Sequence, residues 1–321
     1  MTTTTSTTTT MRAISQDTFG GPGVLKEVEL PRPEPGPGQV LVRVRAAGVN
    51  PTDWKHRAAP LFLGEPPYVL GWDVSGTVEA VGMGVTLFKP GDEVFGMLPY
   101  PYGAGSHAEY VTGPARAFAR KPSAIDHVQA GALPLAALTA WQALVDTARV
   151  EAGQRVLIHA AAGGVGHLAV QIAKARGAYV IGTASAGKHA FLRDLGADEV
   201  IDYRETDFAD AVSGVDVVLD TIGDDDHRTR SLRTLRRGGL LVSILPVGGR
   251  ELAERAQRFG VRTELLLVEA DHAGMNAIAR LAEEGRLRAA IAGTFPLADA
   301  ARAHELGDTG RTAGKLVLTV E

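Results

Sequence analysis

The stretch RVLIHAAAGGVGHLAVQIAKARGA, residues 155–178, joins a short apolar run to a glycine-rich turn and an amphipathic segment. The apolar run has the aliphatic character of a buried strand. After the turn, apolar residues recur at the spacing of a helix; they are Val165, Leu168, Ala169, Ile172 and Ala173. A strand, a glycine turn and a helix in this order are the context in which proteins bind a dinucleotide.

The turn is a variant of the usual dinucleotide fingerprint. Its small residues, which flank Val165, are Ala161, Gly163, Gly164 and Gly166. Small residues let backbone N–H groups and the helix N-terminus approach a pyrophosphate, whose charge the helix dipole favours. A glycine turn that only packs a helix on a sheet is the alternative. The alternating strands and helices that follow the turn favour a dinucleotide site.

From about residue 131 apolar strands alternate with amphipathic helices. The strands read RVLIHA, YVIGT, EVIDY, VDVVLDT, GGLLVSIL and TELLLVE. The helices are expected to begin near Val165, Lys188, Asp207, Asp226 and Arg250. Nearly continuous Val, Ile and Leu suit strands that are buried on both faces. The pattern predicts an α/β domain over residues 131–268, built on a doubly wound parallel sheet.

The rest of the chain has a different character. Residues 11–130 carry short β-rich runs and turns, such as QVLVRVRAAGV after PRPEPGPG, and predict a small, mostly β domain. Residues 269–321 read as helix, strand, helix and terminal strand, and we expect them to return to the first domain. The opening MTTTTSTTTT lacks the basic and apolar regions of a secretion signal. We expect residues 1–10 to be a disordered tail, with the fold starting at Met11.

Composition narrows the possible partners. The 321 residues carry a net charge of −4, which gives no general attraction to nucleic acid or to anionic membranes. The chain has no Cys, which excludes disulfides, thiolate metal sites and a cysteine nucleophile, and fits a reducing cytoplasm. We therefore expect a cytoplasmic protein with a small-molecule partner and with neither a nucleic-acid nor a membrane partner.

The second strand of the α/β domain bears on which dinucleotide is bound. An NAD site normally places Asp or Glu on the adenosine ribose about twenty residues after the glycine turn. Here the strand ends in GTASAGK without a carboxylate, and Ser185 and Lys188 would suit a 2′-phosphate. Tyr203 and Arg204, in VIDYRE, would add a hydrogen bond and a charge. NADPH is therefore favoured, although Lys188 as a solvated lysine at a helix start is the alternative.

The β-rich first domain, AAAGGVG at the turn and GKLVL near the C-terminus together resemble the medium-chain dehydrogenase/reductase superfamily. GDEVFG, HAEY, ALPLAALTAW and VIDYRE resemble its zinc-independent quinone oxidoreductase branch, which includes zeta-crystallin-like proteins and enone reductases. The likeness covers nearly all of residues 11–321. The likeness implies a GroES-like β-barrel catalytic domain that the C-terminal segment completes, with a Rossmann domain inserted between. It also implies an active site in the cleft between domains. Family members are usually homodimers or homotetramers, and we expect a homodimer.

The same resemblance argues against catalytic zinc. Asn50 stands where zinc alcohol dehydrogenases have a metal-binding Cys, and Trp72 stands where they have a metal-binding His. An indole offers no lone pair and a neutral amide is a poor ligand for zinc, so we expect no metal. Without a Lewis acid, reducing an electrophilic acceptor requires less help than oxidising an alcohol.

The segment GVNPTDWKHR, residues 48–57, supplies the predicted catalytic residues Asn50, Asp53 and Lys55. Many quinone reductases of the branch have Tyr where Lys55 stands, and NPxDxK resembles the enone and alkenal oxidoreductases, whose lysine is thought to face the substrate. An ammonium group would stabilise an enolate. The alternatives are a surface Lys55 paired with Asp53, an Asn50 that caps its own turn, and an Asp53 that serves as a structural partner.

Other residues are predicted to contact the nicotinamide part of the cofactor. Thr139, in LTAW, resembles the family threonine beside that ring, with a helix threonine bonded back to its own backbone as the alternative. The remaining candidates follow the carboxyl ends of two strands, where cofactors lie on parallel sheets; they are Thr221, Ile222, Ser243 and Leu245.

The leading hypothesis is a zinc-independent, NADPH-dependent reductase of quinones or α,β-unsaturated carbonyls. One alternative is an enoyl reductase that acts on a carrier-bound substrate. Another is a catalytically weak NADPH-binding protein with a structural or regulatory role, because no side chain is an unambiguous proton donor. The acidic run at residues 224–227 is interpreted as a helix start, and the arginine run RTRSLRTLRR as an amphipathic surface helix.

Overall fold

The computed structural model describes residues 9–245 and 247–321, and the chain divides into two compact units. Unit 1 comprises Met1–Pro134, Ala270–Ala279 and Ile291–Glu321, and unit 2 comprises Leu135–Glu269 and Arg280–Ala290. No helix in the described ranges is long and apolar enough to cross a membrane.

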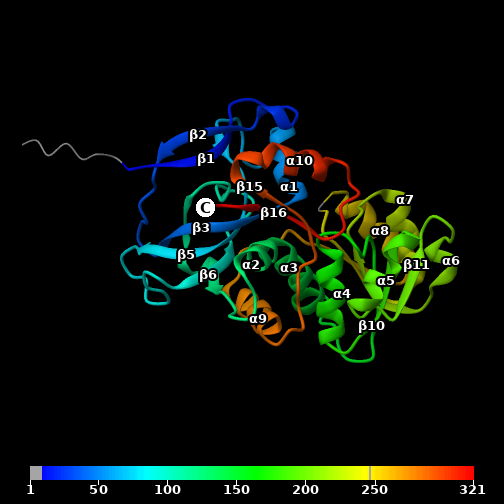
Figure 1. Ribbon diagram of the computed structural model, residues 1–321. Coiled ribbons are helices and arrows are strands. Elements are labelled where there is room, and N and C mark those ends of the chain that lie inside the picture. The colour runs from blue at the N-terminus through cyan, green and yellow to red at the C-terminus, as the bar shows by residue number, and fades with distance from the viewer. Residues whose placement is uncertain (1–8, 246) are drawn as a thin grey trace, which may run out of the picture. The chain divides into compact units, whose positions relative to one another are not determined.

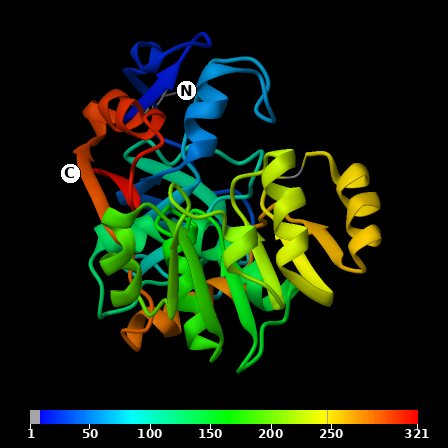
Figure 2. The ribbon, with the colours of Figure 1, turned by 90° about the vertical axis from the view of Figure 1, so that its right-hand side faces the viewer.

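Unit 2 is built on a six-stranded parallel sheet with the order β11-β10-β9-β12-β13-β14. Figure 2 shows its strands alongside one another, from green to yellow. Their bounds are β9 (Arg155–Ile158), β10 (Tyr179–Ala184), β11 (Glu199–Asp202), β12 (Val215–Asp220), β13 (Leu235–Ser243) and β14 (Arg262–Leu265). The strand order reverses beside β9, which is the switch point where such sheets bind ligands. The predicted doubly wound parallel sheet is confirmed.

Helices connect these strands, as the sequence pattern predicts. The connecting helices are α4 (Gly166–Ala175), η4 (Ala186–Lys188), α5 (His189–Asp194), α6 (Phe208–Ala211), α7 (Asp225–Thr234) and α8 (Gly249–Phe259). Helix α3 (Pro134–Trp141) and the π-helix η3 (Gln142–Thr147) precede β9. The core combines aliphatic side chains of neighbouring strands, and Leu157, Ile181, Val218 and Leu241 are fully buried in it. Burial on both faces explains why the central strands β9, β10 and β12 are mostly apolar, whereas the edge strand β14 (RTEL) is not.

Unit 1 is mostly β and contains a seven-stranded sheet in which the chain's last strand lies beside an early one. The strands are β3 (Gln39–Val49), β5 (Asp73–Val81), β6 (Glu93–Met97), β7 (Tyr110–Pro114), β8 (Phe118–Arg120), β15 (Ile291–Pro296) and β16 (Lys315–Thr319). Strand β16 pairs antiparallel with β3; Figure 1 shows it in red beside the blue strand. The C-terminal strand therefore completes this sheet.

A smaller sheet and several helices complete unit 1. The sheet contains β1 (Thr10–Gln16), β2 (Lys26–Pro31) and β4 (Tyr68–Val69). The helices are η1 (Pro22–Val24), α1 (Pro51–Ala58), η2 (Ala115–Ala117), α2 (His127–Ala132), α9 (His272–Glu283), η5 (Leu297–Asp299) and α10 (Ala300–Asp308), of which α9 ends within unit 2. Helix α1 carries the predicted catalytic segment.

Two boundaries differ from the sequence analysis. Strand β1 already includes Thr10, whose Oγ1 donates to Glu29 Oε1 over 2.7 Å, whereas the fold was expected to start at Met11. Residues 1–8 of the predicted disordered tail lie outside the described residues. Arg280–Ala290 group with unit 2 and not with the first domain, because Gln171 of α4 hydrogen-bonds to both the N–H and the carbonyl of Arg288.

Candidate cofactor and acceptor sites

The loop between β9 and α4 is tight at the position of its last glycine. A Cβ atom at Gly166 would lie 2.4 Å from Ala160 O and 2.7 Å from Ala161 Cα, distances that real Cβ atoms do not reach. A Cβ atom at Gly163 would lie 3.1 Å from the same carbonyl oxygen. Ala160 itself has a φ of +43°, an unusual conformation for a residue with a side chain. The backbone therefore turns as sharply as the sequence pattern predicts.

The loop presents backbone N–H groups beside the N-terminus of α4. Ala161 N donates to Thr183 O over 3.0 Å and Gly163 N donates to Ala160 O over 2.8 Å, so these two groups hold the loop itself. The N–H groups of Gly164 and Val165 have no acceptor among the residues that the structure describes. Free N–H groups at a helix N-terminus bind phosphate. The loop therefore fits the pyrophosphate of a dinucleotide.

The end of β10 differs from the sequence analysis in one respect. Ser185 and Lys188 lie half-buried in the turn, and their contact with a 2′-phosphate stays a prediction. However, the neighbouring strand β11 brings the Asp202 carboxylate to the same turn, where it accepts from Ala186 N and Arg204 N over 2.9 Å each. These bonds, that from Arg204 N foremost, lower the pKa of Asp202. The segment GTASAGK itself has no acidic residue, but the parallel pairing of β11 with β10 brings Asp202 beside it.

Tyr203 and Arg204 follow Asp202 at the end of β11. The Tyr203 ring is 55% exposed, and the Arg204 guanidinium lies over it, 5.8 Å from the ring centre. Both side chains are therefore on the surface of unit 2, at the carboxyl edge of the sheet where the sequence analysis places the adenosine end of the cofactor.

The carboxyl end of β12 wraps around a buried carboxylate. Asp220 Oδ1 accepts from the N–H groups of Ile222 and Gly223, each over 3.0 Å. Thr221 Oγ1 donates to His159 O over 2.8 Å, so the Thr221 side chain joins the end of β12 to the end of β9. Ile222 is 41% exposed. The predicted cofactor residues of this loop are thus held by Asp220, which the sequence analysis did not identify.

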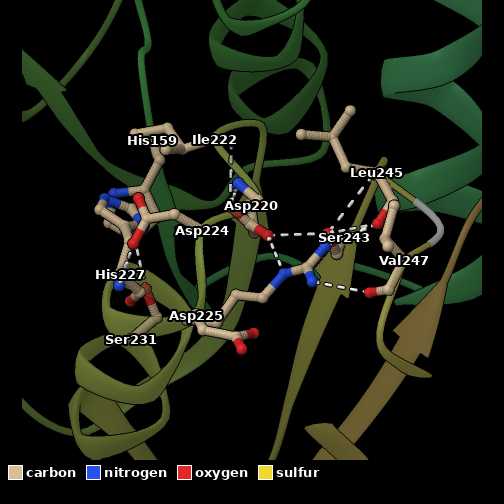
Figure 3. Close-up of polar contacts among 12 residues, drawn as sticks. His159, Asp220, Ile222, Asp224, Asp225, His227, Ser231, Ser243, Leu245 and Val247 are labelled. Atoms are coloured by element: carbon tan, nitrogen blue, oxygen red, sulfur yellow. Dashed lines mark hydrogen bonds and ion pairs between the residues drawn. The ribbon is translucent and has the colours of Figure 1, made fainter. Parts of the chain in front are cut away.

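Arg228 of α7 connects the ends of β12 and β13 from inside the unit. Its Nε lies 3.0 Å from Asp220 Oδ2, and its Nη2 donates to Ser243 Oγ over 2.8 Å and to Leu245 O over 2.6 Å. Its Nη1 donates to Val247 O over 2.7 Å. Figure 3 shows Asp220, Ser243, Leu245 and Val247 converging on these contacts. The predicted cofactor positions Ser243 and Leu245 are therefore fixed by one arginine.

This arrangement corrects the interpretation of RTRSLRTLRR as a surface helix. Arg228, the first residue of the run, is 1% exposed, and the run continues beyond α7 into β13. Helical periodicity does not reveal that an arginine has buried acceptors on two other strands. The acidic residues before the run begin α7, and Asp224 Oδ1 accepts from His227 N over 2.8 Å as an N-cap.

Thr139 lies inside α3 and is 4% exposed. Its Oγ1 donates to Leu135 O over 2.7 Å, one helical turn earlier. This is the bond that the sequence analysis weighed as the alternative to a cofactor contact. Contact of Thr139 with the nicotinamide stays a prediction.

Asp53 holds the first turn of α1 from within unit 1. Asp53 Oδ2 accepts from Asn50 N over 2.6 Å, and Asp53 Oδ1 accepts from Gly71 N over 3.1 Å. The side chain is fully buried, and burial, with the charge of Asp73 adding to it, raises the pKa of Asp53 to about 7. These contacts fit the structural role that the sequence analysis left open for Asp53.

Asn50 belongs to the same buried network. Its Nδ2 donates to Asp73 Oδ2 over 2.9 Å, and its Oδ1 accepts from Lys315 Nζ. Lys315, from β16, also lies 3.5 Å from Asp73 Oδ2. Asn50 is 2% exposed, so both ends of its amide are engaged inside unit 1. In the sequence Lys315 stands out only as part of GKLVL, and no local pattern indicates its contact with Asn50.

Lys55 is separated from these residues. Its side chain is exposed, and it makes no ion pair with any residue that the structure describes, so the surface pair with Asp53 is not formed. Two residues apart on a helix, Asp53 and Lys55 face different directions, whereas Thr52 and Lys55, three apart, are neighbours. The structure thus brings Asn50 and Asp53 together and leaves Lys55 outside their network.

The lost zinc positions hold no ligand cluster. Trp72 is fully buried, with the rings of His56 and Tyr100 centred 5.1 and 5.3 Å away. Within residues 9–245 and 247–321, no three His, Asp or Glu side chains come together as a metal site. The environment of Trp72 is instead aromatic.

Comparison with known proteins identifies the family. A family model described as alcohol dehydrogenase GroES-like domain matches residues 36–123, and one described as zinc-binding dehydrogenase matches residues 195–318. A 2-haloacrylate reductase from a Burkholderia species is 37% identical, over 93% of this chain and 96% of its own. The structure of the quinone oxidoreductase from Coxiella burnetii has a TM-score of 0.92 and 40% identity, over 98% of this chain and 100% of that chain. Escherichia coli quinone oxidoreductase complexed with NADPH has a TM-score of 0.85 and 31% identity, over 96% of this chain and 99% of that chain.

The fold and these relatives define a nicotinamide-dependent oxidoreductase. The chain belongs to the medium-chain dehydrogenase/reductase superfamily, in its zinc-independent quinone oxidoreductase branch. The predicted GroES-like domain and the predicted family are confirmed. The glycine loop of unit 2 is the part of this chain that fits the cofactor's pyrophosphate.

Proposed function

We propose that this protein reduces α,β-unsaturated carbonyl compounds and quinones with NADPH. The observation that carries the proposal is Lys55, an exposed ammonium group on α1 that forms no ion pair with the described residues. When bound, NADPH would supply a hydride to a carbon of the acceptor. Negative charge then develops on the acceptor's carbonyl oxygen, and Lys55 would stabilise it.

Asn50 and Asp53 have a positioning role in this proposal. Their contacts with Asp73, Gly71 and each other fix the start of α1, which carries Lys55. A side chain held by a fixed helix stabilises developing charge better than one on a mobile loop, because the site need not reorganise during the reaction. The Burkholderia relative, named for the reduction of a conjugated acid, supports conjugated acceptors.

NADPH is proposed over NADH because Ser185, Lys188 and Tyr203 gather at the carboxyl ends of β10 and β11. The Escherichia coli relative complexed with NADPH supports this preference. The Asp202 carboxylate is an argument against NADPH, because its charge would repel a 2′-phosphate. However, this carboxylate accepts hydrogen bonds from two backbone N–H groups, those of Ala186 and Arg204. At the nicotinamide end, we propose contacts from Thr139, Thr221, Ile222, Ser243 and Leu245.

The proposal is tested by NADPH oxidation with paired quinone and enone acceptors, with NADH as the comparison. In Lys55→Ala we expect kcat/KM for enones to fall on the order of 10²-fold, the effect of removing one group that stabilises an oxyanion. Lys89→Ala removes another exposed lysine of unit 1 and should leave the rate unchanged. Wild-type protein that binds NADPH and reduces neither acceptor would contradict the proposal.

The same assay separates the alternatives. Activity on enoyl thioesters attached to a carrier, without activity on free enones, would favour the enoyl reductase. Tight NADPH binding with slow turnover that Lys55→Ala does not change would favour a binding protein. We further propose a cytoplasmic homodimer, which sedimentation of the purified protein and fractionation of the source cells would test.

A further inference from the structure

The phenol of Tyr100, in the loop after β6, has a fixed position beside α1. Its Oη lies 3.2 Å from Thr52 Oγ1. Its ring meets the Trp72 ring edge-on at 5.3 Å and the Phe62 ring at 6.3 Å between centres. Tyr100 is neither fully buried nor fully exposed, so a molecule outside unit 1 can reach a ring that its neighbours hold.

The hydrogen bonds of His56 define where its proton lies. Its Nε2 accepts from Phe62 N over 3.3 Å, and a backbone N–H can only donate. Its Nδ1 lies 2.8 Å from Thr52 O, and a carbonyl oxygen can only accept. Burial lowers the pKa of His56, so the ring is neutral near pH 7. Both contacts agree on a neutral ring with the proton on Nδ1.

This tautomer limits the directions of the next hydrogen bonds. Thr52 Oγ1 lies 3.2 Å from His56 Nδ1, which carries a proton and therefore can only donate. Thr52 Oγ1 shares that proton with Thr52 O, which lies closer to Nδ1, and either hydroxyl can donate in the contact between Thr52 and Tyr100. We take the direction in which Thr52 donates to Tyr100 Oη. The O–H of Tyr100 then has a proton left to donate. Its hydroxyl finds no second partner among the residues that the structure describes.

The phenol of Tyr100 stays protonated near neutral pH. Burial raises the pKa of Tyr100 above its usual value, and the nearby charge of Asp53 raises it further. Tyr100 is therefore a neutral O–H donor at any pH near 7. It contacts Thr52, and Lys55 follows three positions later on α1, at the spacing of helical neighbours.

We infer that Tyr100 donates a hydrogen bond to the carbonyl oxygen of the acceptor, next to Lys55, and so forms the neutral half of an oxyanion site. The inference rests on the proposed function. It makes acceptors with a carbonyl oxygen conjugated to the reacting carbon the preferred class, because their charge collects on that oxygen. Tyr100 keeps its proton throughout and shares it in a hydrogen bond that strengthens as the charge develops.

The test compares Tyr100→Phe with Tyr102→Phe. The control removes a phenol from the same loop whose residue is 75% exposed and whose ring also contacts Phe62. In Tyr100→Phe we expect kcat for enones to fall on the order of 10²-fold, with NADPH affinity and melting temperature unchanged. In Tyr102→Phe we expect the wild-type rate. Equal rates in Tyr100→Phe and wild type would overturn the inference.

Further variants separate a donor from a structural tyrosine. Thr52→Val removes the hydroxyl that contacts Tyr100 and keeps the phenol, so we expect kcat to stay within about threefold of wild type, the range for losing one ordinary hydrogen bond. A loss as large as that of Tyr100→Phe would overturn the inference. If Tyr100→Phe is unstable, a series of fluorotyrosines at position 100 provides the test instead. We expect kcat to vary with the acidity of the phenol, and the absence of such a trend would overturn the inference. Wild type inactive on every acceptor overturns the proposed function as well.

Discussion

Arg228 Nε and Asp220 Oδ2 lie 3.0 Å apart inside unit 2, where both side chains are almost completely buried. The pair joins α7 to the carboxyl end of β12, and other guanidinium donors reach Ser243, Leu245 and Val247. Four of the five N–H donors of Arg228 are thus hydrogen-bonded. Such a buried ion pair is costly to break from one side, because the remaining charge loses its partner.

Arg228→Leu should therefore lower the free energy of unfolding by about 3–5 kcal/mol. It should also weaken NADPH binding, because the loops after β12 and β13 lose their common support. Urea unfolding and cofactor titration measure the two effects. Adding Asp220→Asn should restore part of the stability. Arg250→Leu is the control, because the Arg250 side chain is 93% exposed. This variant should change the free energy of unfolding by less than about 1 kcal/mol.

Gly166→Ala should abolish or strongly weaken cofactor binding. The new Cβ would lie 2.4 Å from Ala160 O, so the loop must move away from the geometry that presents its N–H groups. We expect the Kd for NADPH to rise at least about tenfold, equivalent to 1.4 kcal/mol. Gly23→Ala is the matched control because nothing lies within 4 Å of its Cβ position. Equal cofactor affinity in both variants would contradict a phosphate site at this loop.

Lys188→Ala tests the cofactor preference. If Lys188 contacts a 2′-phosphate, losing it should raise the KM for NADPH about tenfold, the range of one charge-assisted hydrogen bond, and leave the KM for NADH unchanged. Steady-state kinetics with both cofactors and one acceptor measure this. Equal changes in the KM for NADPH and for NADH would show that Lys188 supports the turn and does not contact the 2′-phosphate.

Asp53 should make the stability of the protein fall as the pH rises. Burial raises its pKa from 3.8 to about 7, so its contribution to stability is complete below pH 3.8 and is lost as the pH rises through 7. The linked change is on the order of 4 kcal/mol. Asp53→Asn cannot titrate, so its unfolding free energy should vary less between pH 4 and 8 than that of wild type, by urea unfolding at each pH. The exposed-site variant Asp17→Asn should keep the wild-type slope.

Lys315→Met should disturb both stability and catalysis. The buried ammonium contacts Asn50 Oδ1 and Asp73 Oδ2, and its loss removes the cation beside a buried carboxylate, at a cost of about 3–5 kcal/mol. Since Asn50 begins α1, we expect kcat to fall more than the affinity for NADPH, which binds in unit 2. Adding Asp73→Asn should recover stability. Unchanged kcat in Lys315→Met would contradict a positioning role for this network.

Much of the fold follows from local patterns. The glycine turn at residues 160–166 is visible in the sequence because only small residues permit the close backbone contacts that the structure shows there. The parallel sheet of unit 2 is equally predictable, since its central strands β9, β10 and β12 are mostly apolar and helices separate the strands. The return of β16 to the first sheet was expected from the C-terminal segment and the family resemblance.

The site residues that were missed have partners far away along the chain. Asp202 reaches the Ser185 turn through parallel pairing of β10 with β11, and Lys315 reaches Asn50 across 265 positions. Tyr100 meets Thr52 from 48 positions away. No periodicity encodes such contacts, because each depends on which strand or loop the fold places alongside.

The sequence by itself determined the two kinds of domain, the cofactor loop and the absence of thiolate chemistry, because these depend on composition and local spacing. Tertiary structure alone decided which polar residues of GVNPTDWKHR face inward. Packing against Gly71, Asp73 and Lys315 buries Asn50 and Asp53, while the turn of the helix leaves Lys55 exposed. A buried polar group must have partners, whereas an exposed cation can remain available to a substrate, and this difference separates the positioning residues from the proposed catalytic one.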